Sequence, residues 1–169
     1  MSVRAKLVLW RCLSVGHRVT VRGRVWIHGD GDVIVGDDVV LDGANAPIEL
    51  RTRAGARLSI GDRTTIGGGT SIEAEGKLFI GDDVQVGAFS KIIDSHFHRV
   101  TGDRHQRREA GEVVIGDGAV LEPYCIVIPN AVIGPGATVA ARTVVSKKVP
   151  RGAYVVGNPA RVLPERPKP

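Results

Sequence analysis

The chain has 169 residues, enough for one domain with a sizeable core, and its apolar content of 43% excludes disorder throughout. Only 4% of the residues are aromatic and 22 are glycine, which favours a β protein with many tight turns over a helical one. The net charge of +5 suits an anionic partner or simple solubility. Scarce aromatic residues and the lack of a nucleic-acid-binding motif argue against nucleic acid as that partner.

The first segment, residues 1–30, is less regular than the rest. The stretch "VRAKLVLWRCL" (3–13) predicts a short helical or irregular cap, and "VTVRGRVWI" (19–27) alternates like a first strand. Arg11 interrupts the apolar run, so we expect no signal peptide, and no stretch is long enough to span a membrane. A weak contact between this basic, apolar segment and a membrane surface is a second interpretation of it.

Residues 31–163 repeat a unit of six, in which an aliphatic residue is followed by a small residue and then by turn residues. Six is a multiple of the strand period of two and not of the helical 3.6, so each unit predicts a short strand and a corner. The recurring aliphatic residues form groups of three: Val35, Leu41, Ile48; Ile60, Ile66, Ile72; Ile80, Val86, Ile92; Ile115, Leu121, Val127; Ile133, Val139, Val145.

Three units would make one triangular turn, and successive turns would stack about 4.8 Å apart through parallel strand hydrogen bonds. The aliphatic residues would then point inward as continuous columns. A β-sandwich is the competing interpretation, but its strands recur at 8–12 residues without a fixed phase of six. The sequence therefore predicts an all-β, parallel β-helix domain over 31–163, followed by a flexible tail at 164–169.

The repeat is interrupted at three places: around 42–58, around 73–78, and over 94–112. The last and longest break, "DSHFHRVTGDRHQRREAGE", contains three of the five histidines, His96, His98 and His105. A charged loop of this length inside a compact repeat is a candidate functional element.

The repeat, together with the ending "VVGNPARV" (155–162), resembles the hexapeptide-repeat acyltransferases. The resemblance covers about 33–166 and implies a left-handed parallel β-helix. It further implies transfer of an acyl group, most simply from acetyl-CoA or another acyl-CoA, to a hydroxyl or amine of a sugar or sugar-containing acceptor. Relatives work as homotrimers with active sites between subunits, and no metal is expected.

The stretch "IIDSHFH" (92–98) resembles an Asp-Ser-Asp-aromatic-His pattern in sugar and antibiotic acetyltransferases of this family. By that match His98 is the general base, while the departure at His96 makes this residue a second candidate. Asp94, with Glu109 as an alternative, is a candidate to fix the tautomer of the base. A neutral imidazole suits this role because its pKa lies near the operating pH.

The resemblance also implies residues that bind the donor. Cations are expected at the phosphates of coenzyme A, and a small residue where its pantetheine arm approaches the backbone. The candidates are Ala141, Ser146, Lys147, Lys148, Arg161 and Arg166.

One departure concerns the thioester carbonyl. Some relatives bind it through an amide in a Trp-Ile-Gly-Ser or Trp-Ile-Gly-Ala stretch, where this chain has "VLEP" (120–123). Pro123 has no N–H to donate, so either the oxyanion is stabilised elsewhere, with the Tyr124 amide as the candidate, or the donor is held differently.

Two other functions fit the same fold. A metal-dependent hydratase resembling γ-class carbonic anhydrase would need three histidine ligands, and the histidine-containing hexad of that family is absent. A non-catalytic scaffold or binding module would not need His98. Because Cys12 and Cys125 are too few for a disulfide framework, we expect a reducing, cytoplasmic setting.

Overall fold

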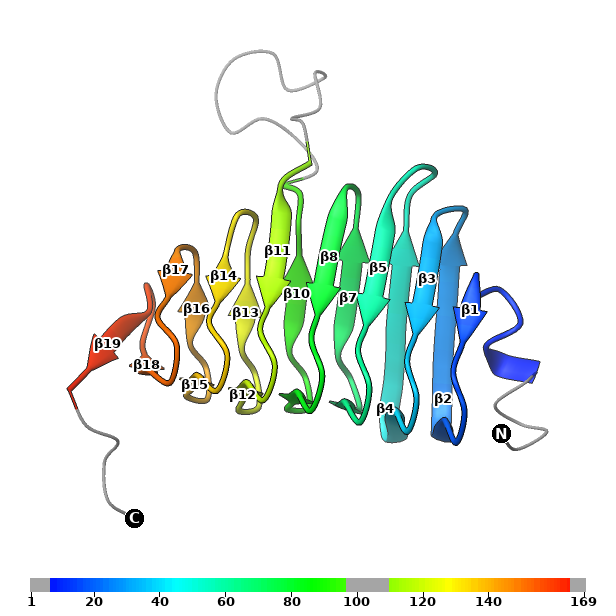
Figure 1. Cartoon of the computed structure of the whole chain (residues 1–169), viewed down its shortest axis with the longest axis horizontal. Helices are drawn as coiled ribbons and strands as arrows, with labels where there is room; N and C mark the ends of the chain where they lie inside the picture. The colour runs from blue at the N-terminus through cyan, green and yellow to red at the C-terminus, as the bar shows by residue number, and fades with distance from the viewer. Residues whose placement is uncertain (1–6, 97–109, 165–169) are drawn as a thin grey trace.

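The computed structural model describes residues 7–96 and 110–164. Within them the chain forms strands β1 to β19, which coil around one long axis as a three-sided stack (Figure 1). Leu7 and Val8 are helical and lead into this stack. The architecture confirms the predicted left-handed parallel β-helix with a short N-terminal cap.

Face one is a sheet of seven parallel strands, one from each successive coil. In order they are β1 (Ser14–Val15), β3 (Asp32–Val35), β5 (Arg57–Ile60), β8 (Lys77–Ile80), β11 (Glu112–Ile115), β14 (Val132–Ile133) and β17 (Lys148–Val149). The register aligns Ile60 with Ile80 and Ile80 with Ile115, so equivalent positions of the repeat lie directly above one another.

The other two faces share one sheet, because β2 (Thr20–Gly29) and β4 (Val40–Thr52) are long enough to run through both. Face two continues from the first half of β4 through β6 (Thr65–Gly67), β9 (Gln85–Val86), β12 (Val120–Leu121), β15 (Thr138–Val139) and β18 (Tyr154–Val156). Face three continues from its second half through β7 (Ser71–Ala74), β10 (Lys91–Ile93), β13 (Ile126–Val127) and β16 (Val144–Val145).

The core is made of the aliphatic columns that the six-residue period predicts. All fifteen residues of the five predicted groups are buried, with at most 3% of their surface exposed. One detail differs in the irregular stretch around 42–58: Leu50, rather than Ile48, pairs with Ile72 in the face-three column. Both residues are fully buried, because β4 continues through the corner and contributes more than one inward position.

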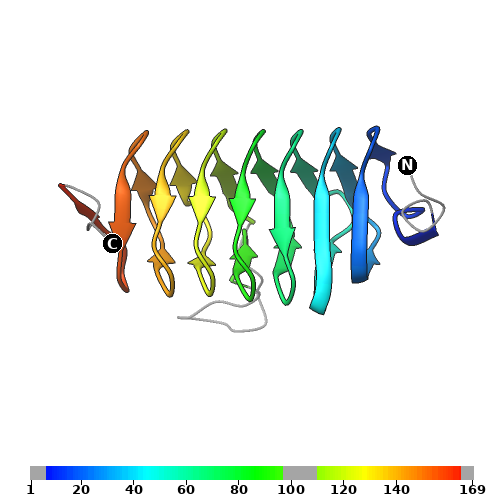
Figure 2. The same ribbon diagram turned by 90° about the horizontal axis from the view of Figure 1, so that it is seen from below.

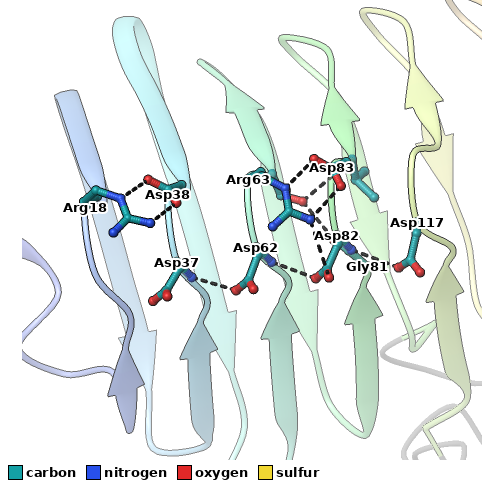
Figure 3. Close-up of polar contacts among 11 residues, drawn as sticks. Arg18, Asp37, Asp38, Asp62, Arg63, Gly81, Asp82, Asp83 and Asp117 are labelled. Atoms are coloured by element: carbon teal, nitrogen blue, oxygen red, sulfur yellow. Dashed lines mark hydrogen bonds and ion pairs between the residues drawn. The ribbon is translucent and has the colours of Figure 1, made fainter.

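Faces one and two meet at what we call the first edge, where the coils that carry Asp37, Asp62, Asp82 and Asp117 repeat the same corner (Figure 3). The carboxylate of Asp62 accepts a hydrogen bond of 2.8 Å from the Asp37 N–H, and that of Asp82 accepts one of 2.8 Å from the Asp62 N–H. Asp117 continues the series by accepting from the Asp82 N–H at 3.0 Å. The preceding residue must be small: a Cβ on Gly81 would lie 2.2 Å from Asp117 Oδ1. The "IGD" of the repeat is thus a packing requirement between coils.

The two ends of the stack are closed differently (Figure 2). At the N-terminal end, Leu9 is 2% exposed and joins the core. At the C-terminal end, β19 (Arg161–Leu163) turns back and pairs with β18 in antiparallel orientation. The chain direction therefore reverses after the last coil.

Candidate functional site

Faces three and one meet at what we call the third edge, where the long break in the repeat begins. It leaves the stack after β10 at Asp94 and returns before β11 at Gly111. The Gly111 N–H donates to the Asp94 carbonyl oxygen at 2.7 Å, so the two ends of the insertion are joined at its base. The insertion emerges at one edge of an otherwise regular stack.

Asp94 anchors this base to the preceding coil. Its side chain is fully buried, and its Oδ1 and Oδ2 accept hydrogen bonds of 2.8 Å from the N–H groups of Glu75 and Gly76. Burial raises the pKa of the Asp94 carboxyl above its ordinary value, although the two N–H donors oppose this rise. Both carboxylate oxygens are already bonded to backbone, so the geometry favours a positioning role for Asp94.

The next residues lead toward the predicted general base. The buried Ser95 hydroxyl donates to Glu75 Oε2 at 3.0 Å, and His96 is half-buried beside it. His98, Glu109 and Arg166 lie outside the described residues. The choice of base between His98 and His96 therefore stays a prediction.

The predicted phosphate-binding residues gather at the C-terminal part of the third edge. Ser146, Lys147, Lys148 and Arg161 line one cavity of about 260 Å³, although Arg161 comes from the reversed strand β19. Both lysines and Arg161 are exposed. Three cations around one cavity form a site suited to a phosphate group.

Ala141 lies elsewhere, at the corner between faces two and three, which we call the second edge. Its N–H donates to Glu122 Oε2 at 3.0 Å. The candidate replacement for the missing oxyanion donor lies at the same edge, but the Tyr124 N–H donates to the Ala88 carbonyl oxygen at 2.9 Å. That amide is therefore committed to the coil stack, and the expectation that it binds the thioester carbonyl is wrong.

Sequence reasoning missed a groove of about 510 Å³ on face two. Small residues such as Gly67, Gly87 and Ala88 line it together with five polar residues, Asp42, Asn45, Thr65, Gln85 and Glu122. Beside it, the rings of Phe89 and Tyr124 stack with centroids 5.3 Å apart. The sequence signal that could have identified this groove is the polar character of Thr65 and Gln85, which stand at exposed positions of the neighbouring strands β6 and β9.

Two further observations concern metal ligands and membrane-spanning helices. Across residues 7–96 and 110–164, no group of three or more His, Cys, Asp or Glu side chains is arranged to hold a metal ion. In the same part of the chain, no helix is long and apolar enough to cross a membrane.

A family model described as "Bacterial transferase hexapeptide (six repeats)" matches residues 112–147. Two curated relatives match in part. The chain is 45% identical to "Putative acetyltransferase YvoF" of Bacillus subtilis (strain 168) over 53 residues, which is 31% of each chain. It is 44% identical to serine acetyltransferase 4 of Arabidopsis thaliana over 63 residues, 37% of this chain and 16% of that one. The chain thus spans less than a third of the length of these relatives.

Solved structures match over nearly the whole chain. The acetyltransferase VCA0836 of Vibrio cholerae O1 biovar eltor, complexed with acetyl coenzyme A, has a TM-score of 0.66 and 23% identity, over 95% of this chain and 74% of that one. A mutant of AntD, an N-acyltransferase from Bacillus cereus in complex with dTDP and coenzyme A, has a TM-score of 0.78 and 20% identity, over 99% and 90%. The polysialic acid O-acetyltransferase OatWY has a TM-score of 0.71 and 20% identity, over 89% and 80%. At these identities the likeness shows the fold.

Proposed function

We propose that this chain, which has the left-handed β-helix fold and a match to the hexapeptide transferase model over residues 112–147, transfers an acetyl group from acetyl-CoA to a sugar-containing acceptor. The observation that carries the proposal is the arrangement along the third edge. The base of the histidine-bearing insertion and the cavity lined by Lys147 lie at this edge two coils apart, about 10 Å at the usual spacing of parallel strands. The acetyl-CoA and coenzyme A complexes of VCA0836 and AntD support the choice of donor.

The proposed reaction is a direct transfer. The imidazole of His98, or of His96, removes the proton of the acceptor hydroxyl or amine while that oxygen or nitrogen attacks the thioester carbonyl carbon. The carbon–sulfur bond then breaks, and the proton passes from the imidazolium to the departing thiolate to give free coenzyme A. General base catalysis of this kind contributes about 10²–10⁴-fold to the rate.

Thiol release from acetyl-CoA, measured against a panel of sugars and nucleotide sugars, tests this function. We expect His98→Ala to lower kcat by about 10²–10⁴-fold. His17→Ala is the control, because His17 is exposed at the first edge and should leave kcat unchanged. Loss of turnover in His96→Ala alone would move the base to His96. Full turnover in both variants would contradict histidine catalysis and favour a non-catalytic scaffold.

Donor binding is tested separately at the cavity of the cations. We expect Lys147→Gln and Arg161→Gln each to raise the KM for acetyl-CoA about tenfold, since each removes a charged hydrogen-bond donor. Dephospho-CoA, which lacks the 3′-phosphate, shows which cation binds that group. A variant that already lacks the contact with the 3′-phosphate should show no further rise in KM when the donor lacks this phosphate. Arg151→Gln is the control, because Arg151 is exposed at the first edge.

We further propose that the active unit is a homotrimer. Ala141 and Lys147 are both expected to contact the donor, yet they lie at the second and third edges of the same chain. They can line one site when two neighbouring chains each contribute an edge. Sedimentation velocity should give the mass of three chains, and a monomer with full activity would contradict the shared site.

We also propose a weak contact with a membrane surface and a cytoplasmic location. Leu7, Trp10 and Leu13 of the N-terminal cap are 71%, 73% and 62% exposed beside Arg11, which suits a weak contact with a membrane surface. Co-sedimentation with anionic and neutral vesicles tests this contact. Cys12 and Cys125 are both free, which fits a reducing, cytoplasmic setting; fractionation of cells that express the protein would test it.

A further inference from the structure

A second cationic cavity lies at the third edge, on the N-terminal side of the insertion. It measures about 360 Å³ and is lined by His28, Arg51, Arg53, Glu73 and Glu75. Its residues belong to successive coils: His28 of β2 pairs with Arg51 of β4, which pairs with Glu73 of β7. None of the basic lining residues, His28, Arg51 and Arg53, belongs to a predicted donor-binding or catalytic group.

Around this cavity three basic side chains, Arg51, Arg53 and Lys91, face two acidic ones, Glu73 and Glu75. The Glu73 carboxylate is held by Lys91 Nζ at 2.9 Å and by the Ser71 hydroxyl at 3.2 Å. Glu75 accepts from Ser95. Across the described part of the chain, neither Arg51 nor Arg53 forms an ion pair with a carboxylate, and both side chains are exposed. Lys91 compensates the charge of Glu73, and Arg51 and Arg53 have no carboxylate partner among the described residues, so the surplus of positive charge suits the cavity to an anion.

The cavity is also connected to the base of the insertion. Glu75 lines it, and the same residue contacts the insertion twice, through its side chain to Ser95 and through its N–H to Asp94. An anion held by Arg51 and Arg53 would therefore lie next to the segment that leads to the predicted base. The cavity of Lys147 lies on the opposite, C-terminal side of the insertion. The insertion thus separates two cationic sites.

We propose that Arg51 and Arg53 bind an anionic group of the acyl acceptor, a phosphate or a carboxylate, while the C-terminal cations bind the donor. This assignment rests on the proposed function. Guanidinium groups form paired, charge-assisted hydrogen bonds with both kinds of anion. The group has two sources, the diphosphate of a nucleotide-linked sugar and the carboxylate of an acidic glycan. The site therefore selects charged acceptors over neutral sugars.

Direct binding tests the site without any turnover. The probes are dTDP, an oligosaccharide of sialic acid and neutral maltotriose, each titrated calorimetrically into the full chain. We expect one of the two anions to bind, and Arg51→Gln/Arg53→Gln to weaken it by about tenfold or more for each arginine. Maltotriose should not bind. Arg57→Gln is the matched control, because Arg57 follows the same turn but pairs with Asp32 at 3.3 Å on face one. The identity of the anion that binds distinguishes the two sources.

Kinetics separate a failure of this site from a failure of the proposed function. The double variant should raise the KM of the anionic acceptor and leave the KM of acetyl-CoA unchanged. If neither anion binds, or if the double variant binds and turns over every acceptor like the wild type, the site is overturned while acyl transfer stands. If the anion binds through both arginines but no acceptor releases thiol from acetyl-CoA, acyl transfer is overturned and the anion is not part of an acceptor.

Discussion

The first and third edges of the stack share one kind of contact between coils, but the carboxylates that make it differ in burial. At both, a carboxylate of one coil accepts hydrogen bonds from backbone N–H groups of the coil before it. At the first edge this contact recurs on successive coils, from Asp37 to Asp117, and its carboxylates are half-buried or exposed. At the third edge Asp94 makes it once, with two N–H groups, and is fully buried. Repetition maintains the stack, whereas the single buried contact fixes the point where the insertion leaves it.

The largest expected effect comes from removing the buried contact. Asp94→Ala leaves the half-buried N–H groups of Glu75 and Gly76 without acceptors and removes a fully buried side chain, and we expect it to lower the free energy of unfolding by about 3 kcal/mol. Asp117→Ala at the first edge removes one exposed acceptor and should cost less than half of that. Urea denaturation of both variants measures the difference. Equal losses would show that the two edges do not differ energetically.

The glycines at the first edge give the next largest effect. Gly81→Ala places a Cβ 2.2 Å from Asp117 Oδ1 and 2.8 Å from the Asp117 backbone nitrogen, so neighbouring coils must move apart, at about 2–3 kcal/mol. Gly118 has φ of +65° with nothing within 4 Å of an added Cβ, so Gly118→Ala should cost only about 1 kcal/mol of backbone strain. Thermal unfolding of both variants tests this order. A larger loss in Gly118→Ala would mean that corner conformation, not contact between coils, selects glycine.

Lowering the pH should change the contributions of the two edges to stability in opposite directions. Hydrogen bonds to Arg18 and Arg63 lower the pKa values of Asp38 and Asp83, so their contribution to stability is present above the ordinary value of 3.8 and is lost as the pH falls through their folded-state pKa values. Burial raises the pKa of Asp94, so its contribution is present below 3.8 and is lost as the pH rises through its folded-state pKa.

Unfolding free energies of wild type, Asp94→Asn and Asp38→Asn, measured between pH 3 and 7, test these signs. As the pH falls, we expect the stability of wild type to rise relative to Asp94→Asn and to fall relative to Asp38→Asn. A parallel dependence in both comparisons would contradict the difference between the edges.

The smallest effect concerns the exposed ion pairs of the first edge. Arg63 bonds Asp83 through two nitrogens at 2.7 Å, but both side chains are about half exposed. We expect Arg63→Gln to lower the melting temperature slightly at low ionic strength and not at all at about 1 M salt, where such charges are screened. A loss that persists at high salt would indicate a packing role for the Arg63 side chain.

The stack was predictable because its determinants are local and repeated. A single buried aliphatic residue in each unit, such as Ile80 or Leu121, sets the phase, and the "IGD" corner supplies the turn. The exception is β4, where the column uses Leu50 because strand pairing with β7 decides the register and the spacing along the chain does not. Such a choice depends on a neighbouring coil and is not visible in the repeat itself.

The candidate site was predictable only where the repeat or the family motif extends into it. The family resemblance implied Ser146, Lys147 and Arg161 as donor-binding residues, and the structure places all three around one cavity, while their binding of coenzyme A stays a prediction. By contrast, Arg51 and Arg53 lie in an irregular stretch, and that they form no ion pair within the part of the chain that the structure describes depends on the contacts of Lys91 and Ser95 with the nearby acids. The role of Asp94 as an anchor depends on backbone N–H groups nearly twenty residues earlier, which no local pattern indicates.

The reversed strand β19 has a consequence for association between molecules. A solenoid of parallel strands ends in unpaired backbone groups, which form a template that further chains can extend into a fibre. On face two this template is occupied by β19, whose antiparallel direction and length of three residues do not continue the six-residue coil. The segment that carries Arg161 into the cationic cavity thus also covers the end of face two against pairing with a further coil.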